Sequence, residues 1–390
     1  MYWRRTVLQK AAIDALLAVE KPIYDLSKGK LAKNRFLSAL DIPHVGTNVK
    51  IVKETDESTF IAKFNPDGSY DNSDFRILCT TDLHLDEDPE LNNRTLQHMI
   101  YQIADLKPDL VVITGDSILS KMQQTDAVQF ARMMERVGVY WAYTFGNHEA
   151  REEKGSFKYM LFKSLVDSPM CLSKFGREDL FGYGNFFINI MNGENSIRKS
   201  LVFFDSGRDI IEAYGVRDGV PADKMRGYDY IKPSQLEWYQ NNIKALSQTY
   251  GKVESFVYQH IPVPEYAEFY KKQLDGSYAL NDGVNVVYGT MRESVGCSTY
   301  NSGQFDVMKK IGGQAMFCGH DHCNDFCIEK DGIYLVYNQT GGYNCYDLYE
   351  KDKLSPDPAQ WPFGVSFTDI HSDGTFDLGH RTHAEFFIDK

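Results

Sequence analysis

The chain has 390 residues, of which 43% are hydrophobic and 25% charged, and its formal net charge is -12 at pH 7. This composition is that of a globular protein with enough apolar material for a large core. It excludes long nucleic acid as an expected partner, because tracking a phosphate backbone requires a basic surface. No run is long and apolar enough to cross a bilayer, so we expect no transmembrane segment.

The N-terminal segment differs in charge from the rest of the chain. Residues 1–40 hold eight Lys or Arg against three acids, a net +5, which leaves -17 for the remainder. Apolar residues from Val7 to Val19 recur at helical spacing, so we predict a basic helical extension over residues 1–45. An Arg pair near the start is a feature of some export signals, but the apolar stretch is short and contains Asp14. We expect a cytoplasmic protein, with export by an atypical N-terminal signal as the alternative.

The remainder, residues 46–390, is interpreted as one domain in which strands and helices alternate. A hairpin is expected at the start of this domain, and residues 265–313 are less regular and are expected to form an insertion. Predicted helices cover 95–106, 126–137 (with Asp126 as N-cap), 154–166 and 233–248. Predicted strands cover 48–53, 59–64, 75–80, 110–114, 139–143, 186–191, 199–204, 256–258, 315–318, 326–330, 333–337, 365–370 and 384–388. This order predicts an α/β (α+β) sandwich of two packed mixed β-sheets flanked by helices.

Seven cysteines are scattered along the chain, and an odd number does not suggest a disulfide framework. Cys79 and Cys318 fall inside predicted strands, where a thiol behaves as a small core residue. Cys323 and Cys327 follow two histidines and leave a zinc site as an alternative. We interpret all seven, including Cys345, as reduced thiols.

Five of the predicted strands lead directly into residues of the kind that bind metals. The residues after the successive strands are Asp82 and His84, Asp116, Asn147 and His148, His260, and finally His320 and His322. Because the carboxyl ends of parallel strands line one crevice of an α/β sheet, these side chains can converge although they are far apart in sequence. Singly, each has a plainer interpretation as a helix cap, a turn residue or a structural histidine. Together they indicate a metal site.

The chemistry of this set suits two metal ions. Carboxylates neutralise and bridge, imidazoles bind borderline divalent metals, and an amide adds a ligand without charge. Two ions roughly 3.5–4 Å apart can clamp the attacking and leaving oxygens of a phosphoryl transfer. Asp116, which ends its strand between the other ligands, is the natural bridge.

The order D-x-H, G-D, G-N-H-E, a lone His and G-H-x-H resembles the calcineurin-like metallophosphoesterase superfamily. The resemblance implies a phosphoric ester hydrolase with two divalent ions (Mn, Fe or Zn) and a metal-bridging hydroxide. The first metal would be held by Asp82, His84, Asp116 and His322, and the second by Asp116, Asn147, His260 and His320. His148 would face the substrate as general acid or as a donor to the phosphoryl oxygens. The irregular segment 265–313 is expected to lie over the active-site face.

The likeness is strongest to single-domain phosphatases filed under purple acid phosphatase names, and it covers residues 75–388. Purple acid phosphatases have a tyrosine three residues after the bridging aspartate, where this chain has Leu119. A tyrosinate–iron bond at this position is therefore not expected. If another tyrosine reached the site, Tyr143 and Tyr343 would be the first candidates.

The expected activity is that of a phosphomonoesterase acting on a phosphorylated small molecule or a phosphoprotein. The alternatives are a phosphodiesterase for small diesters or cyclic nucleotides, and a degenerate scaffold that only binds. Arg151 and Arg292 are candidate clamps for a phosphate oxygen. For either arginine, a surface salt bridge is the plainer interpretation.

Overall fold

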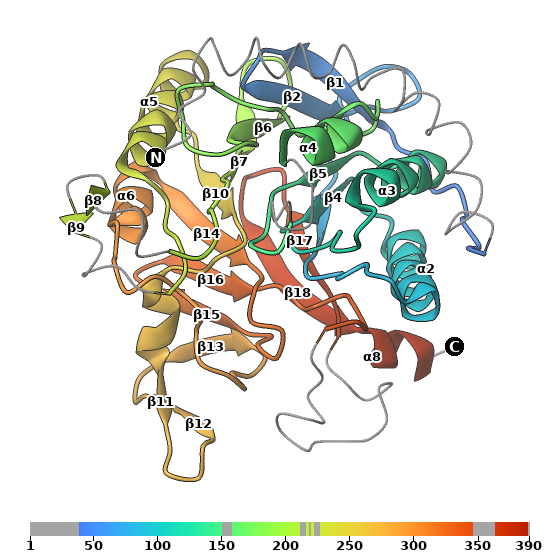
Figure 1. Cartoon of the computed structure of the whole chain (residues 1–390). Helices are drawn as coiled ribbons and strands as arrows, with labels where there is room; N and C mark the ends of the chain where they lie inside the picture. The colour runs from blue at the N-terminus through green and yellow to red at the C-terminus, as the bar shows by residue number, and fades with distance from the viewer. Residues whose placement is uncertain are drawn as a thin grey trace.

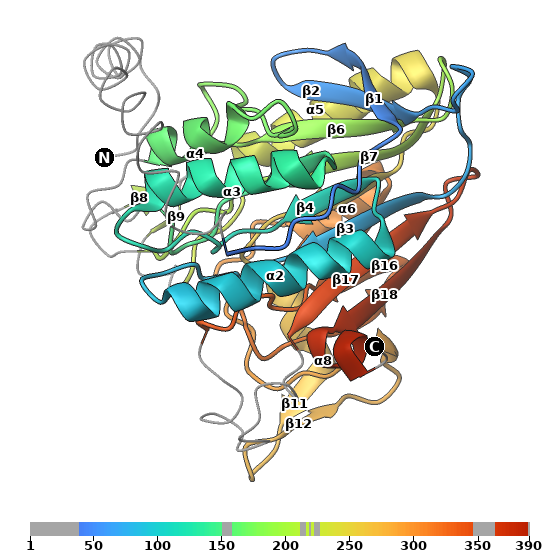
Figure 2. The same ribbon diagram turned by 90° about the vertical axis from the view of Figure 1, so that its right-hand side faces the viewer.

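A computed structural model describes residues 39–149, 158–210, 216–217, 220–221, 227–345 and 363–388. The helix expected between Val7 and Val19, and with it most of the 1–45 extension, lies outside the described residues. Two β-sheets pack face to face, and helices cover their outer faces (Figures 1 and 2). The predicted sandwich of two mixed sheets flanked by helices is confirmed.

The larger sheet has nine strands in the order β1-β2-β6-β7-β10-β14-β16-β15-β13. Their bounds are β1 Val49–Glu54, β2 Ser58–Lys63, β6 Phe186–Met191, β7 Ile197–Phe203, β10 Ser255–Tyr258, β13 Asn285–Tyr288, β14 Gly313–Cys318, β15 Cys327–Lys330 and β16 Ile333–Tyr337. Strand β10 runs parallel to both β7 and β14, and β14 runs parallel to β16. The carboxyl ends of these central strands therefore lie at one edge of the sheet.

The smaller sheet has five strands in the order β18-β17-β3-β4-β5. Their bounds are β3 Phe75–Thr80, β4 Leu110–Ile113, β5 Trp141–Tyr143, β17 Gly364–Ile370 and β18 Phe376–Thr382. Strands β3, β4 and β5 are parallel neighbours, so their carboxyl ends also share an edge. Two short hairpins, β8 (Val216–Arg217) with β9 (Val220–Pro221) and β11 (Tyr270–Lys272) with β12 (Tyr278–Leu280), lie outside the two sheets.

Apolar side chains fill the space between the sheets. Ile77, Cys79 and Val112 of the small sheet belong to one buried cluster with aromatic residues of the large sheet, such as Phe256 and Phe317. Burial of this much apolar area at roughly 25 cal/mol per Å² is the main term that holds the sheets together. The packing brings the two carboxyl-terminal edges close to each other.

Helices α2 (Pro89–Leu106), α3 (Gln123–Val137) and α4 (Lys158–Val166) cover the outer face of the small sheet (Figure 2). Helices α5 (Pro233–Tyr250) and α6 (Gln304–Ile311) cover the large sheet on the other side of the molecule (Figure 1). Asp88 caps α2 by accepting from the backbone of Glu90 and Leu91, and Gly138 ends α3 in the left-handed conformation. Within the described part of the chain, no helix combines the length and apolar character that crossing a membrane requires.

Two sequence expectations are wrong at the level of elements. Residues 384–388 were expected as a strand but form helix α8 (His383–Ile388), and the strand β18 before it was not expected. A capping box explains the helix: Thr382 N donates to Glu385 Oε2 at 2.7 Å, and Glu385 N donates to Thr382 Oγ1 at 3.0 Å. Asp126 is not an N-cap, because α3 begins at Gln123 and the Asp126 carboxylate accepts from the Ser120 hydroxyl.

The 265–313 segment is more regular than expected. It contains most of the 3₁₀ helix η5 (Pro264–Phe269), the projecting β11–β12 hairpin, strand β13 and helix α6 (Figure 1). Its later part packs on the loop after β14, where Gly296 N donates to Asp321 Oδ2 at 2.8 Å. The segment thus contacts the loop that contains His320 and His322, while its role as a cover for the site remains a prediction.

Candidate metal centre

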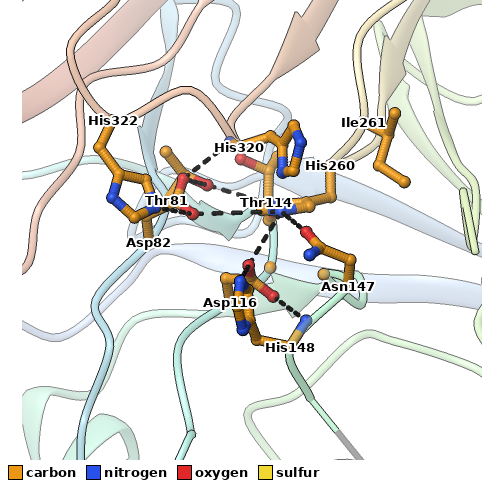
Figure 3. Close-up of polar contacts among 12 residues, drawn as sticks. Thr81, Asp82, Thr114, Asp116, Asn147, His148, His260, Ile261, His320 and His322 are labelled. Carbon is orange, nitrogen blue, oxygen red and sulfur yellow. Dashed lines mark hydrogen bonds and ion pairs between the residues drawn. The ribbon is translucent and has the colours of Figure 1, made fainter. Parts of the chain in front are cut away.

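Polar side chains from both sheets meet where the two carboxyl-terminal edges face each other (Figure 3). The small sheet contributes Asp82 and His84 after β3, Asp116 after β4, and Asn147 and His148 after β5. The large sheet contributes His260 after β10, and His320 and His322 after β14. All of them except His148 are buried.

Asp82 is fixed by one carboxylate oxygen and leaves the other to the cluster. Its Oδ2 accepts from Thr81 Oγ1 at 2.7 Å and from the backbone N of His320 at 2.9 Å. Its Oδ1 is buried without a hydrogen-bond donor and lies 3.3 Å from His322 Nε2 and 3.7 Å from His84 Nε2. His84 Nε2 likewise has no hydrogen-bond partner. These bare atoms are an arrangement that a bound cation would satisfy.

Asp116 is arranged in the same way, with one carboxylate oxygen hydrogen-bonded and the other facing the cluster. Its Oδ1 accepts from the backbone N of His148 at 2.7 Å, while its buried Oδ2 has no donor and lies 3.2 Å from His260 Nε2. His260 Nδ1 lies 2.8 Å from the Thr114 carbonyl, which can only accept, so we assign the ring proton to Nδ1. The lone pair on Nε2 then faces Asp116 Oδ2 and, at 3.0 Å, Asn147 Oδ1. Either a bound metal ion or a second proton on His260, at Nε2, satisfies these three atoms.

The electrostatics of the site point the same way. Burial alone would lower the pKa of His260, but the carboxylates of Asp116 and Asp82 outweigh it and raise that pKa to about 10. Burial, with the neighbouring His260 charge, instead lowers the pKa of His320 to about 3. The site therefore stabilises one positive charge strongly and keeps His320 as a neutral donor.

The ligand loops of the small sheet are held in an uncommon backbone conformation. Asp82, His84 and Asp116 have positive φ angles of 51°, 46° and 48°. The two loops bond to each other, with Asp82 N donating to Gly115 O and His84 N to Asp116 O, both at 3.0 Å. Left-handed non-glycine residues cost free energy and persist where the surroundings fix them, often at functional sites.

Glu149 fixes the loop that contains Asp116 and joins it to the loop after β5. Its carboxylate accepts four backbone N–H groups, from Asp116, Ser117, Ile118 and Gly146, at 2.6–3.2 Å, and also the Tyr143 hydroxyl. Burial and the charge of Asp116 raise the pKa of Glu149 to about 7, against the effect of the backbone donors. A Cβ at Gly146 would lie 2.0 Å from Asp116 Oδ1, so this close approach requires glycine.

His148 differs from the other histidines of the site in its exposure. Its side chain is 36% exposed, and its Nε2 lies 3.9 Å from Asp116 Oδ2. The backbone bond to Asp116 fixes the residue beside the cluster while leaving the ring accessible (Figure 3). This position suits a group that meets substrate.

The two candidate phosphate clamps have different outcomes. Arg151 lies outside the described residues. Arg292 donates through Nη1 to Asp325 Oδ1 at 2.6 Å and to the Cys323 carbonyl at 3.3 Å. The salt bridge that was its plainer interpretation is thus present, and phosphate binding by Arg292 remains a prediction.

Sequence reasoning did not single out Cys345, which lies beside the metal cluster. Its buried Sγ donates to the Asp82 carbonyl at 3.1 Å and groups with ring nitrogens of His84 and His322. Gly341 and Gly342, earlier in the same loop, are compatible with a close backbone approach, but they do not indicate what Cys345 contacts. Neither candidate tyrosine directs its hydroxyl into the cluster, because Tyr143 donates to Glu149 and the Tyr343 hydroxyl lies 2.8 Å from His98 Nδ1.

The residues present fit a pair of divalent ions. Within the described residues, three overlapping groups of potential ligands have their donor atoms within 4.8 Å of one another. These groups are His84, His322 and Cys345; Asp116, His260 and His320; and Asp82, His84 and Asp116. Mixed carboxylate and imidazole donors suit Mn²⁺, Fe²⁺ or Zn²⁺.

Comparison with known proteins places the chain in a family. The calcineurin-like phosphoesterase family model matches residues 75–324, and the chain belongs to this family. It thereby confirms the resemblance based on the five motifs.

Relatives in two organisms show how some similar family members are named. "Probable inactive purple acid phosphatase 14" of Arabidopsis thaliana is 29% identical over 323 residues, covering 73% of this chain and 73% of that protein. "Probable inactive purple acid phosphatase 29" of the same plant is 28% identical over 313 residues, covering 70% and 74%. "Phosphatase DCR2" of Saccharomyces cerevisiae is 28% identical over 298 residues, covering 70% of this chain and 48% of that protein.

Solved structures with a similar course of the chain are more distant. A dimetal phosphatase from Danio rerio has a TM-score of 0.49 at 12% identity, covering 80% of this chain and 98% of that one. The purple acid phosphatase PPD1 from yellow lupin has a TM-score of 0.44 at 13% identity, covering 84% and 54%.

Proposed function

We propose that the chain is a metal-dependent phosphatase that hydrolyses phosphoric monoesters at a centre of two divalent ions. The observation that supports this most is that three buried atoms able to bind a metal converge without a hydrogen-bond partner. They are Asp82 Oδ1, Asp116 Oδ2 and His84 Nε2. Burying such groups unpaired costs free energy, and a folded chain keeps them where a ligand repays that cost.

The proposed ligand sets are those that the resemblance to the family implies, and the grouping of the donor atoms supports them. The first ion would be held by Asp82, His84, Asp116 and His322, and the second by Asp116, Asn147, His260 and His320. When bound, two such ions supply Lewis acidity and lower the pKa of a water molecule between them. Asp116 belongs to both sets because it groups with Asp82 and His84 and, separately, with His260 and His320.

His148 is the proposed general acid. Its accessible ring stands beside Asp116, with Nε2 3.9 Å from Asp116 Oδ2. A protonated His148 can donate its Nε2 proton to the leaving oxygen of the ester, or hydrogen-bond a phosphoryl oxygen. Thr81 and Glu149 touch no substrate in this scheme and act by positioning the two carboxylates.

Activity and preference for monoesters are both parts of the proposal. Several relatives are named probable inactive, whereas the yeast relative is named a phosphatase. We infer activity here because every ligand position and His148 are occupied by a competent residue, even though Leu119 provides no tyrosinate. The net charge of -12 disfavours polyanionic nucleic acid and is compatible with small phosphate esters.

A matched pair of substrates tests the proposal. The protein is stripped with a chelator, reloaded with Mn²⁺, Fe²⁺ or Zn²⁺, and assayed on an aryl phosphate monoester and the corresponding bis-aryl diester. We expect metal-dependent hydrolysis that is faster on the monoester and strongly reduced in His148→Ala. Faster cleavage of the diester would overturn the monoesterase assignment. Absence of hydrolysis on both with two ions bound would overturn the catalytic one.

A further inference from the structure

The loop after β16 runs directly along the ligand loop after β3. Gly341 N donates to Thr81 O at 2.9 Å, and Asn344 Nδ2 donates to His84 O at 3.1 Å. A Cβ at Gly342 would lie 2.2 Å from the Leu83 carbonyl oxygen, so only glycine permits this approach. The loop therefore passes close to the metal ligands, and Cys345 follows in it.

The Cys345 thiol is placed among the ligands of the first ion. The residue is 8% exposed, and its Sγ lies within 4.8 Å of a ring nitrogen of His84 and of His322. Zinc binds imidazole nitrogen at about 2.0–2.1 Å and thiolate sulfur at about 2.3 Å, so two such donors on one ion lie at most roughly 4.4 Å apart. A small side-chain movement brings all three within bonding distance of one ion.

A hydrogen bond accounts for the burial of the Cys345 thiol, but not for the unpaired polar atoms of His84 and Asp82 beside it. Cys345 Sγ donates to the Asp82 carbonyl at 3.1 Å, which is a satisfied if weak bond. His84 Nε2 and Asp82 Oδ1 remain buried without hydrogen-bond partners in the same place. A cation between these three residues accounts for the thiol, the imidazole and the carboxylate together.

We propose that Cys345 is a thiolate ligand of the ion held by Asp82, His84 and His322, an inference that rests on the proposed metal centre. On binding, the sulfur–hydrogen bond breaks, the proton leaves to solvent, and a sulfur–metal bond forms with no change of oxidation state. The thiolate gives the first ion an additional anionic ligand. Leu119, at the position of the tyrosine in purple acid phosphatases, provides none. Because thiolate is a soft ligand, this site selects Zn²⁺ or Fe²⁺ over Mn²⁺.

X-ray absorption at the zinc edge tests the proposal on the whole chain loaded with two equivalents of zinc. We expect a sulfur neighbour at about 2.3 Å in the wild-type protein and none in Cys345→Ser. The matched control is Cys323→Ala, which removes another buried thiol next to His322 and should keep the sulfur neighbour. Competition between Zn²⁺ and Mn²⁺ gives a second readout, in which Cys345→Ser should lose part of the preference for zinc.

The outcomes separate this inference from the proposed function. Two zinc ions surrounded only by nitrogen and oxygen would overturn the thiolate ligand and leave the metal centre standing. Loss of the sulfur signal in Cys323→Ala instead of Cys345→Ser would also overturn it. Failure of the wild-type protein to bind zinc at all would overturn both. Should Cys345→Ser not fold, the wild-type and Cys323→Ala spectra decide: a sulfur neighbour in both supports Cys345, and its absence from either overturns the proposal.

Discussion

The two sheets contribute chemically different halves of the site. The small sheet provides both carboxylates and the amide, together with His84 and the accessible His148. The large sheet provides the imidazoles of His260, His320 and His322, and the loop after its strand β16 contains Cys345. Neither edge alone combines enough charge and enough donors for two ions, so the centre depends on the face-to-face packing of the sheets.

The two edges also differ in how their loops are fixed. On the small sheet, three residues of the site have positive φ angles, and the Glu149 carboxylate holds the loop of one of them, Asp116, through backbone N–H groups. On the large sheet, His320 alone among the described site residues has a positive φ, of 84°, and its backbone N is held by Asp82. The small sheet therefore organises the site, and changes there should have the larger effects.

The largest effect is expected from Asp116→Asn. This change keeps the shape of the side chain but removes the negative charge shared by both ligand sets. We expect activity to fall to background and elemental analysis to find no more than one ion per chain. Asp179→Asn, at an exposed carboxylate paired with Arg177, is the control and should retain both ions. Two ions retained in Asp116→Asn would mean that Asp116 is not the shared ligand.

His148→Ala should separate catalysis from metal binding. Removing a positioned general acid lowers turnover by roughly 10²–10⁴-fold. Because His148 is accessible and belongs to neither ligand set, both ions should remain. Steady-state kinetics and metal analysis on the same preparation check this. Loss of an ion in His148→Ala would show that His148 is itself a ligand.

Thr81→Val should have a smaller effect that acts through Asp82. The valine is close in shape but cannot donate the 2.7 Å hydrogen bond to Asp82 Oδ2. Losing a group that orients a ligand typically costs about 10–100-fold in metal affinity. Thr81→Ser keeps the hydroxyl and should restore the affinity, as measured by titration with a competing chelator. Equal losses in both variants would point to packing rather than to the hydrogen bond.

The smallest effect is expected at the contact between α2 and α8, away from the ligands. Burial lowers the pKa of His98 to about 4 and that of His383 to about 3, from an ordinary 6.5. Between pH 6.5 and 4 the unfolded chain takes up protons that the folded chain does not, so stability falls as the pH falls. In metal-free protein, His383→Gln should reduce this fall in a urea titration at pH 7 and pH 5. If His383→Gln leaves the pH dependence of stability unchanged, the lowered pKa of His383 is not its cause.

The sequence was informative where chemistry follows directly from a strand. Asp82, Asp116 and His260 each come two residues after a predicted strand, and parallel strands bring such positions together whatever the details of packing. The capping box formed by Thr382 and Glu385 is also a local pattern, and it indicates the helix α8 that the sequence analysis did not predict.

The rest depended on contacts between distant segments. Cys345 reaches the site only because the Gly341–Gly342 backbone fits against the chain at Leu83, and no local pattern encodes that fit. The ion pair of Arg292 with Asp325 likewise joins the irregular segment to the loop after β14. Such contacts depend on the packing of the whole fold and cannot be predicted from the spacing of residues in the sequence.

A crystal structure of the protein loaded with Mn²⁺, with anomalous scattering measured at the manganese edge, tests the central claim most directly. The account predicts two peaks roughly 3.5–4 Å apart between the two sheets. One peak should lie beside Asp82, His84 and His322, and the other beside Asn147, His260 and His320, with Asp116 contacting both. A single peak, or peaks bound by residues of only one sheet, would contradict it.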